Sequence, residues 1–355
     1  MRILFIVPYP TGRAPSQRFR FEQYYPLLTE KGYQYEIAPF LSESTWKILY
    51  TPGNKLNKAL GIMVGFWKRF LLLFGLGKYD WIFIHREASP IGPPIFEWII
   101  AKVLGKKIIY DFDDAIWLPN TSENNRIVAD IKWHSKVGSI CKWAYKVSCG
   151  NDYLCDYARQ FNPNVVLNPT TIDTEHHHNK VKQHREGEIP VLGWTGTHST
   201  IQYLDMVVPI LQKLESQLNF RFVVISNRKP DIQLASLEYI EWSKATEIED
   251  LLRFDVGIMP LTEDKWAKGK CGFKALQYMA LGIPAITSPV GVNTKIVDAG
   301  INGFLCDNSQ EWEQAINTLL MNPQMRISFG RKAREKIENH FSVRANSSNF
   351  LSLVA

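Results

Sequence analysis

Short apolar runs alternate with longer helical patterns along the first 160 residues. Runs of strand length bounded by turn residues are typical of buried strands, and longer periodic segments indicate helices. Strands are expected at 3–7, 35–38, 81–84, 107–110 and 146–149, and helices at about 17–30, 56–75, 94–104, 127–143 and 152–160. This alternation predicts a parallel sheet covered by helices on both faces.

The alternation stops at residues 173–189, which contain three consecutive histidines and almost no apolar residue. It then begins again. Strands are expected at 191–194, 221–225, 256–259 and 284–287, and helices at 201–218, 247–253, 273–281, 311–321 and 323–340. The pattern predicts an α/β protein with two Rossmann-like domains and a cleft between their parallel sheets. Ligands of such sheets bind beyond the carboxyl ends of the strands.

A length of 355 residues suits two domains of ordinary size. We expect the first domain at 1–172, an exposed linker at 173–189 and the second domain at 190–340, with a C-terminal tail at 341–355 that could pack back on the first domain. The linker histidines His176, His177 and His178 could bind a metal. No carboxylate or fourth ligand is spaced to complete such a site, so we expect a solvated loop and no metal.

The composition, 45% hydrophobic and 21% charged, excludes a disordered tail, a collagen-like fibre and a disulfide miniprotein. Five scattered cysteines form neither a CxxC motif nor a zinc spacing, which favours a reduced cytoplasmic compartment. The apolar N-terminus ends at Pro8 without a small-residue cleavage site, so we expect a strand and not a signal peptide. Lys68 and Arg69 interrupt the most apolar stretch, 59–77, which argues against a membrane-spanning helix.

Charge is distributed unevenly along the chain. Residues 1–150 carry 20 Lys and Arg against 12 Asp and Glu, a net charge of +8, whereas residues 151–355 carry 21 against 23, a net charge of −2. The first domain is therefore expected to meet something acidic. Residues 50–77 combine basic, aromatic and aliphatic side chains, which suits peripheral membrane contact and, with comparable weight, a helix packed on its own domain.

A basic loop containing Gly272 precedes an expected helix that begins at Phe273. The free amides of a helix N-terminus attract anions, and Lys270 and Lys274 add positive charge there. Gln277 lies one turn further along and could face the same ligand. The pattern fits a phosphate-binding loop and, about equally, a solvated basic loop before an ordinary core helix.

Four segments follow one another in a characteristic order: 3–8 with the following Gly12, then 168–173, 193–196 and 255–303. Together they resemble the GT-B-fold glycosyltransferases, specifically family 4 of the retaining enzymes (glycosyl transferases group 1). The resemblance implies transfer of a sugar, with retention of configuration, from a nucleotide-diphosphate sugar on the second domain to an acceptor on the first. It implies no metal or resident cofactor, and a carbohydrate or lipid-linked acceptor of a cell-surface polysaccharide or glycolipid pathway, used in the cytoplasm or at the inner membrane face.

Two departures from the family pattern bear on the donor side. The family usually has two glutamates at the positions of Gly269 and Gln277; Gln277 can still hydrogen-bond a ribose hydroxyl, but Gly269 has no side chain. Where the family often has Arg and Lys after the first strand of the second domain, this chain has Gly196 and Thr197. We expect their amides to bind the diphosphate together with the two lysines, although Gly196 could equally serve only a tight turn.

On the acceptor side, His85 follows a strand and resembles the family's cleft histidine, which implies contact with the sugar or acceptor; a structural role has about equal weight. Asp111, Asp113 and Asp114 follow the next strand. A divalent-metal site, a phosphatase-type nucleophile and an acceptor-contacting loop all remain open interpretations. We find no partner motifs for the first two and the family is generally metal-independent, so we favour the loop, with Asp113 as an acid/base group.

Arg13 and Arg18 follow Gly12 and could close on a diphosphate or an anionic acceptor, whereas Arg20 fits a basic helix face. Two functions stay open: an active transferase, or a catalytically degenerate nucleotide-sugar-binding protein, which Gly269 would favour. The basic residues match no nucleic-acid-binding motif, so we expect no nucleic-acid partner.

Overall fold

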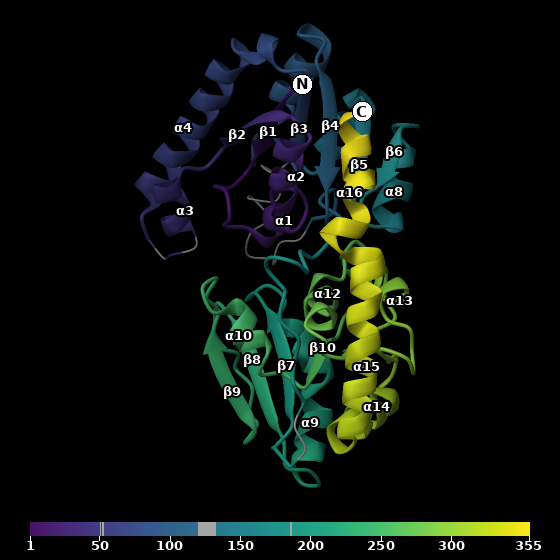
Figure 1. The fold of residues 1–355 in the computed structure, drawn as a ribbon. Coiled ribbons are helices and arrows are strands. Elements are labelled where there is room, and N and C mark those ends of the chain that lie inside the picture. Colours follow the sequence, from purple (N-terminus) through teal and green to yellow (C-terminus); the bar gives the residue numbers. More distant parts are fainter. Residues whose placement is uncertain (50, 52, 120–132, 185–186) are drawn as a thin grey trace. The chain divides into compact units, whose positions relative to one another are not determined.

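The computed structural model describes residues 1–355 except 50, 52, 120–132 and 185–186, and the chain divides into two compact units (Figure 1). The first unit contains Met1–Thr170 and Asn346–Ala355, and the second contains Thr171–Ala345. Each unit is built on one six-stranded sheet. In the described part of the chain, no helix has the length and apolar character needed to cross a membrane.

The sheet of the first unit has the strand order β2-β1-β3-β4-β5-β6, and all neighbouring strands are parallel. Its strands are β1 (Arg2–Val7), β2 (Gln34–Pro39), β3 (Trp81–His85), β4 (Lys107–Phe112), β5 (Lys146–Cys149) and β6 (Val165–Leu167). β1 and β3 are neighbours although β2 separates them in the sequence. Such a switch point opens a crevice beyond the carboxyl ends of the two strands, where ligands bind in this class of sheet.

Helices lie around this sheet (Figure 1). They are α1 (Pro15–Arg18), α2 (Tyr25–Glu30), α3 (Glu43–Leu49), α4 (Lys55–Leu73), α5 (Ile95–Trp98) with a π-helical turn (Ile99–Val103), α7 (Lys136–Trp143), α8 (Asp152–Arg159) and α16 (Val343–Leu351). The single helix expected at 17–30 is broken, because Pro26 lacks an amide hydrogen and is tolerated only at the start of α2. The expected helix at 127–143 lies partly outside the described residues.

The C-terminal residues return to the first unit through α16. The ring of Phe350 stacks on that of Tyr24 with 4.1 Å between centroids, and the Asn349 amide donates to the Leu167 carbonyl oxygen at 3.1 Å. Phe350 is buried by this contact. The last ten residues therefore contribute to the core of the first unit.

The second sheet has the order β12-β11-β10-β7-β8-β9 and is also fully parallel. Its strands are β7 (Val191–Gly196), β8 (Arg221–Ser226), β9 (Leu237–Glu241), β10 (Val256–Met259), β11 (Ala285–Thr287) and β12 (Gly303–Leu305). Counted from β7, this is the doubly wound order of dinucleotide-binding sheets, with its switch point between β7 and β10. The pattern missed β9 and β12.

The helices of the second unit are shorter on average than the sequence suggests. They are α9 (Val208–Glu215) after a 3₁₀ segment (Ile201–Met206), α10 (Glu247–Leu251), α11 (Lys265–Lys268), α12 (Phe273–Ala280), α13 (Asn293–Ile296), α14 (Ser309–Met321) and α15 (Pro323–Lys336), which is followed by a π-helical turn (Ile337–Phe341). The helix expected at 201–218 is divided where Pro209 starts α9, for the same reason as in the first unit.

Two facing glycines bring α12 close to this sheet. Gly193 on β7 and Gly257 on β10 are cross-strand partners. A Cβ atom on Gly193 would lie 2.0 Å from the ring of Phe254, and one on Gly257 would lie 2.2 Å from the ring of Tyr278. The Tyr278 hydroxyl in turn accepts from the Thr195 amide at 2.9 Å. The missing side chains therefore let α12 lie directly on the switch point.

In the polar segment 173–189 most described residues are exposed, but Thr174 and His178 are buried. His178 is fully buried, and the Arg334 guanidinium donates to its carbonyl oxygen at 2.6 Å. Lys182 forms an ion pair of 3.2 Å with Asp255, the residue before β10. The described part of the segment belongs to the second unit, and no group of metal-ligating side chains is found among the described residues.

Candidate functional site

Two groups of polar side chains occupy equivalent places, one in each unit. Each group follows the carboxyl ends of the strands that flank the switch point of its sheet. This is where parallel α/β sheets bind ligands, because the loops there diverge and the helix N-termini point toward the opening. The two groups are described separately below.

In the second unit, β7 ends at Gly196 and continues into Thr197. A Cβ atom on Gly196 would lie 2.4 Å from the ring of Trp194 and 2.8 Å from the Thr200 hydroxyl, so only glycine fits this turn. The Thr197 amide donates to that same hydroxyl at 3.3 Å. The turn is thus held internally, and a phosphate would have to compete with Thr200 for the Thr197 amide.

The N-terminus of α12 lies beside this turn, because Gly196 and Lys274 both contact the ring of Trp194. Gly272 is the N-cap with a φ of +69°, a left-handed conformation that favours glycine, and a Cβ atom there would lie 2.2 Å from Ile296. Lys274 lies over the Trp194 ring with its Nζ 5.5 Å from the centroid. Phe273, the first residue of the helix, is half-buried. Gly196 and Lys274 therefore lie against the same indole ring, and Gly272 caps the helix that carries Lys274.

Lys270 belongs to the loop between α11 and α12. Its Nζ lies 4.8 Å from the centroid of the Trp266 ring. The pKa of the Asp264 carboxyl lies below its usual range. Burial opposes this shift, whereas the hydrogen bonds of Asp264 with Thr262 and the backbone, together with the charge of Lys270, cause it. Both predicted phosphate-binding lysines are thus ordered on aromatic faces, a cation–π arrangement that keeps an ammonium group in place without removing its charge.

Gln277 lies on the second turn of α12 and is 5% exposed. In the described part of the chain its side-chain amide makes no hydrogen bond. The amide is not among the enclosed polar atoms that lack a partner in the described residues, so the small exposed surface of Gln277 includes its amide, and a ligand can reach it. Gly269 ends α11 as its C-cap residue and contributes no side chain. Of the two family glutamate positions, only Gln277 therefore offers a side chain for a ligand.

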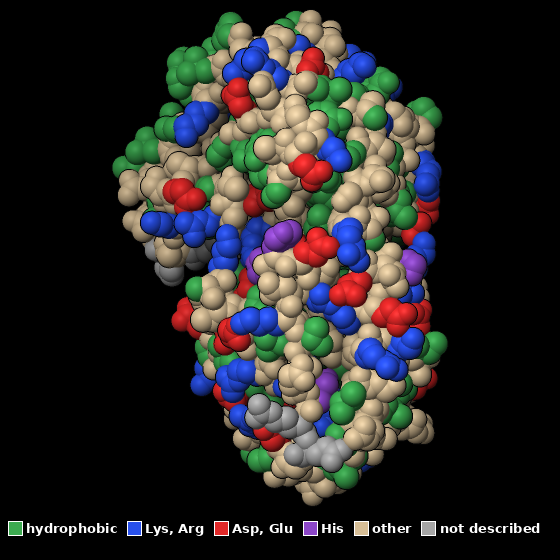
Figure 2. Space-filling model, in the orientation of Figure 1, with side chains coloured by type: hydrophobic (Ala, Val, Ile, Leu, Met, Phe, Trp, Pro, Cys, Tyr) green, Lys and Arg blue, Asp and Glu red, His purple; other side chains and the backbone are tan. Residues whose placement is uncertain are grey.

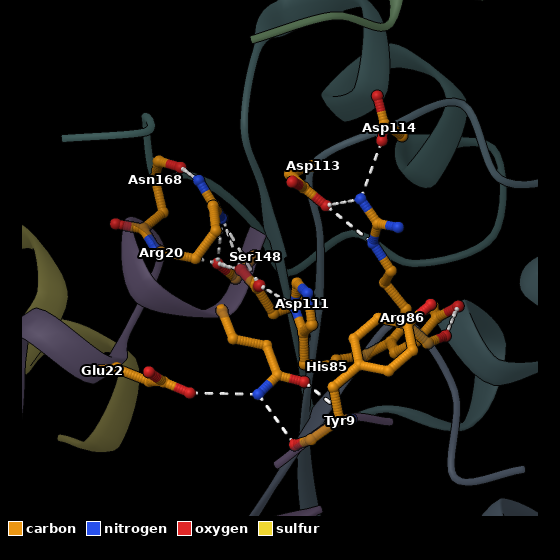
Figure 3. Close-up of polar contacts among 12 residues, drawn as sticks. Tyr9, Arg20, Glu22, His85, Arg86, Asp111, Asp113, Asp114, Ser148 and Asn168 are labelled. Carbon is orange, nitrogen blue, oxygen red and sulfur yellow. Dashed lines mark hydrogen bonds and ion pairs between the residues drawn. The ribbon is translucent and has the colours of Figure 1, made fainter. Parts of the chain in front are cut away.

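In the first unit, three neighbouring strands place His85, Asp111 and Ser148 in one row. His85 and Asp111 are cross-strand partners at the ends of β3 and β4, and Asp111 and Ser148 are partners on β4 and β5. The Ser148 hydroxyl donates to Asp111 Oδ1 at 2.6 Å (Figure 3). All three side chains are completely buried.

Arg20 completes this row from outside the sheet. Its guanidinium forms a buried ion pair with Asp111 and also donates to the carbonyl oxygen of Asn168 (Figure 3). Burial alone would raise the pKa of Asp111, but Arg20 and the hydrogen bond of His85 hold it well below its usual value. Assigning Arg20 to a basic helix face was wrong, because it is 1% exposed and neutralises the one carboxylate in this row.

His85 receives its orientation from Asp111. Its Nδ1 lies 2.8 Å from Asp111 Oδ2. An ionised carboxylate only accepts hydrogen bonds, so Nδ1 carries the proton, and in the neutral ring Nε2 is then an acceptor. Nε2 is buried and has no hydrogen-bond partner in the described part of the chain. The ring is therefore fixed by a carboxylate and leaves one acceptor unused.

Asp113 and Asp114 lie away from this row. The Arg86 guanidinium donates to Asp113 Oδ1 at 2.8 Å and to Asp114 Oδ2 at 2.7 Å (Figure 3). Burial opposes the charge of Arg86, but the two carboxylates raise its pKa above the usual value. Arg86 itself has a φ of +59°, which is uncommon for a residue with a side chain. The three carboxylates are thus neutralised by arginines, which accounts for their proximity without a metal ion.

The loop after β1 is held by carboxylates of its own unit. The Gly12 amide donates to Glu22 at 2.8 Å, and the φ of Gly12 is +76°. Arg13 forms an exposed ion pair of 3.0 Å with Glu43, and the Arg18 guanidinium lies over the ring of Phe19 at 4.9 Å. Of these two arginines, Arg18 is buried and Arg13 is half-exposed.

Sequence reasoning missed Arg20, Ser148 and Asn168 as members of the polar group. A usable signal was present for Ser148 only. It is a polar residue at the end of an apolar strand, like His85 and Asp111, and parallel strands end at a common edge. Arg20 is joined to Asp111 across 91 positions of sequence, and that contact depends on the strand order.

Comparison with known proteins finds a family that the second unit resembles. The model of the family "Glycosyl transferases group 1" matches residues 189–322. Residues of the chain are 32% identical to spore coat protein SA of Bacillus subtilis (strain 168) over 78 positions, which is 21% of either protein, so the match spans about a fifth of that relative.

Solved structures match the chain over nearly its whole length. Sucrose-phosphate synthase from Thermosynechococcus elongatus has a TM-score of 0.69 at 13% identity, covering 99% of this chain and 98% of its own. Anabaena Alr3699/HepE in complex with UDP and glucose has a TM-score of 0.67 at 13% identity, covering 100% and 99%. The catalytic domain of starch synthase IV from Arabidopsis thaliana, bound to ADP and acarbose, has a TM-score of 0.69 at 11% identity, covering 99% and 98%. The expected GT-B fold is confirmed.

Proposed function

We propose that the protein is a glycosyltransferase that moves a sugar from a nucleoside-diphosphate sugar, bound by the second unit, to a carbohydrate or lipid-linked acceptor. The observation that carries this proposal is the accessible amide of Gln277, which makes no hydrogen bond in the described part of the chain and lies on the helix whose N-terminus carries Gly272 and Lys274. A ribose hydroxyl would satisfy the amide, and a diphosphate would be stabilised by the helix N-terminus and the lysines.

The chemistry expected at this site is stabilisation of a departing diphosphate. Negative charge accumulates on the leaving phosphate, and fixed cations and amides lower the energy of that state. Lys274 and Lys270 are ordered over Trp194 and Trp266, so little further ordering is needed when the ligand binds. In the first unit, Asp111 holds His85 so that Nε2 can accept a hydrogen bond from a sugar hydroxyl.

We also propose retention of configuration and a role in cell-surface polysaccharide or glycolipid synthesis at the cytoplasmic face of a membrane. These finer statements rest on the resemblance to the retaining family and on the positive charge of the first 150 residues. Asp113 is a weak candidate for an acid/base group, because Arg86 already engages its carboxylate. His85 is the better candidate for contact with the transferred sugar.

Calorimetric titration with UDP, GDP, ADP and their sugar conjugates tests the proposal. We expect one nucleotide series to bind, and the double variant Lys270→Ala, Lys274→Ala to bind it at least about tenfold more weakly, since charge-assisted contacts are worth about 1.5–3 kcal/mol. Lys268→Ala is the matched control, because Lys268 ends α11 two positions before Lys270 and forms an ion pair with Glu263. Equal losses in the control and the double variant would contradict the phosphate assignment.

A degenerate nucleotide-sugar-binding protein is the second candidate, favoured by the absence of a side chain at Gly269. The two functions differ in turnover. Release of the free nucleotide from its sugar conjugate, with a panel of acceptors present, supports the transferase. Binding without any turnover supports the degenerate protein.

A further inference from the structure

Helix α4 presents its most apolar side to solvent. Large apolar side chains from Leu56 to Phe74 are 45–77% exposed. They are Leu56, Leu60, Met63, Val64, Trp67, Phe70, Leu71 and Phe74. At about 100° per residue these eight positions fall within an arc of about 120°, so they form one continuous stripe along the helix. We call this set the α4 stripe.

The opposite side of α4 carries small and polar residues beside partly buried apolar ones such as Ile62, Phe66 and Leu72. A Cβ atom on Gly61 would lie 2.4 Å from Thr45, and one on Gly65 would lie 2.6 Å from the ring of Phe40. Arg69, one turn further, is 1% exposed and donates to the carbonyl oxygens of Val7 and Ala88 at 2.8 and 2.7 Å. Surface helices normally place polar residues outward, so the apolar outer side of α4 is unusual.

The apolar surface extends beyond α4. The ring of Phe66 on α4 lies 6.1 Å from that of Phe96 on α5. Next to this contact, Ile95, Trp98, Val103 and Leu104 are 41–61% exposed. Figure 2 shows hydrophobic side chains gathered over the outer side of α4, which Figure 1 places at an edge of the first unit. Patches of this extent on a single chain mark interaction surfaces.

The segment that carries the α4 stripe is basic, although Lys78 pairs with Glu36 and Arg69 is buried. Residues 44–79 contain six Lys and Arg and no Asp or Glu. Lys55 and Lys68 are exposed on α4, and Lys102 is exposed on the turn after α5. Lysines can rest their alkyl stems on an apolar surface and extend their ammonium groups to the phosphates of a bilayer. Trp67 and Trp98 have the amphipathic rings typical of the interface region.

We propose that the α4 stripe lies in the interface of a membrane that contains anionic phospholipid. The helix is interrupted by Lys68 and is not apolar enough to span a bilayer, so it would lie in the plane of the surface with the stripe among the acyl chains. The exposed lysines supply attraction to the anionic headgroups. This inference concerns the first unit alone and does not depend on the donor site of the second.

Co-sedimentation with vesicles of phosphatidylcholine alone, and of phosphatidylcholine with 30% phosphatidylglycerol, tests the proposal. We expect binding to the anionic vesicles that is weakened, without being abolished, at high salt. The double variant Trp67→Glu, Phe70→Glu should bind at least about tenfold more weakly, because it removes two apolar anchors and adds two repelled charges. Ile301→Glu, Met321→Glu is the matched control, since both residues are exposed on the second unit.

Several outcomes would overturn the proposal. Absence of binding to both vesicle types would do so, as would equal losses in the two double variants. A dimer of the wild-type chain in light scattering that Trp67→Glu, Phe70→Glu converts to a monomer would identify a second copy of the chain as the occupant. Urea unfolding followed by circular dichroism shows whether both variants fold. Nucleotide affinity, measured on the same samples, should be unchanged in both, which separates this test from that of the donor site.

Discussion

Polar side chains lie at the same topological position in the two sheets, but the hydrogen bonds and ion pairs that they form differ. In the first unit, Arg20, Asp111 and Ser148 satisfy one another in the interior, and His85 Nε2 is left as an acceptor. In the second unit, the lysines rest on indole rings and the amide of Gln277 is left without a partner in the described part of the chain. In a closed network, the polar groups satisfy one another and hold one another in place. An amide without a partner can instead form hydrogen bonds with a ligand.

The closed network gives the largest expected effect. We expect Asp111→Ala to lower the free energy of unfolding by about 3–5 kcal/mol, because it leaves the Arg20 guanidinium buried without its carboxylate. Urea unfolding followed by circular dichroism measures this loss. Arg13→Ala removes an exposed ion pair with Glu43 and should cost less than about 1 kcal/mol. If the two variants lose the same amount, the first unit does not depend on this network.

A backbone substitution in the second unit should have an intermediate effect. Gly257→Ala places a Cβ atom 2.2 Å from the ring of Tyr278, so α12 must move away from the sheet. We expect a loss of about 1–3 kcal/mol in the free energy of unfolding, together with weaker nucleotide binding. The matched control is Gly75→Ala, where the nearest atom is a carbonyl oxygen at 3.7 Å and the stability should change little. A stable Gly257→Ala variant with normal affinity would show that the position of α12 is not critical.

The parallel sheets could be predicted from the sequence because their central strands are buried on both faces and therefore form unbroken apolar runs. The short edge strands β6 and β12 are only three residues long, which is too few to show a pattern. His85 and Lys274 could be selected because polar residues at strand ends and helix starts have a recurrent meaning in α/β folds.

Other features depend on contacts that no local pattern contains. The sequence around Arg20 fits the polar face of a helix. Only the adjacency of β3, β4 and β5 shows that a buried carboxylate lies next to Arg20. The segment 173–189 has the composition of a linker, yet Arg334, far along the chain, binds its backbone carbonyl groups and buries His178. Conversely, the apolar runs of α4 fit a helix packed on its own domain as well as a helix exposed to solvent. The close contacts of Gly61 and Gly65 show which side of α4 faces the first unit.

The variant Gln277→Leu tests the central claim most directly, because binding should change while stability does not. Leucine has a similar size, and the amide that it replaces makes no hydrogen bond in the described part of the chain, so the free energy of unfolding should change by less than about 1 kcal/mol. Nucleotide affinity should fall about tenfold, because the ligand loses the hydrogen bonds of that amide. Urea unfolding and calorimetric titration of the same sample measure both quantities. Unchanged affinity, or a loss of stability that accompanies the loss of affinity, would contradict the assignment of Gln277 to the donor site.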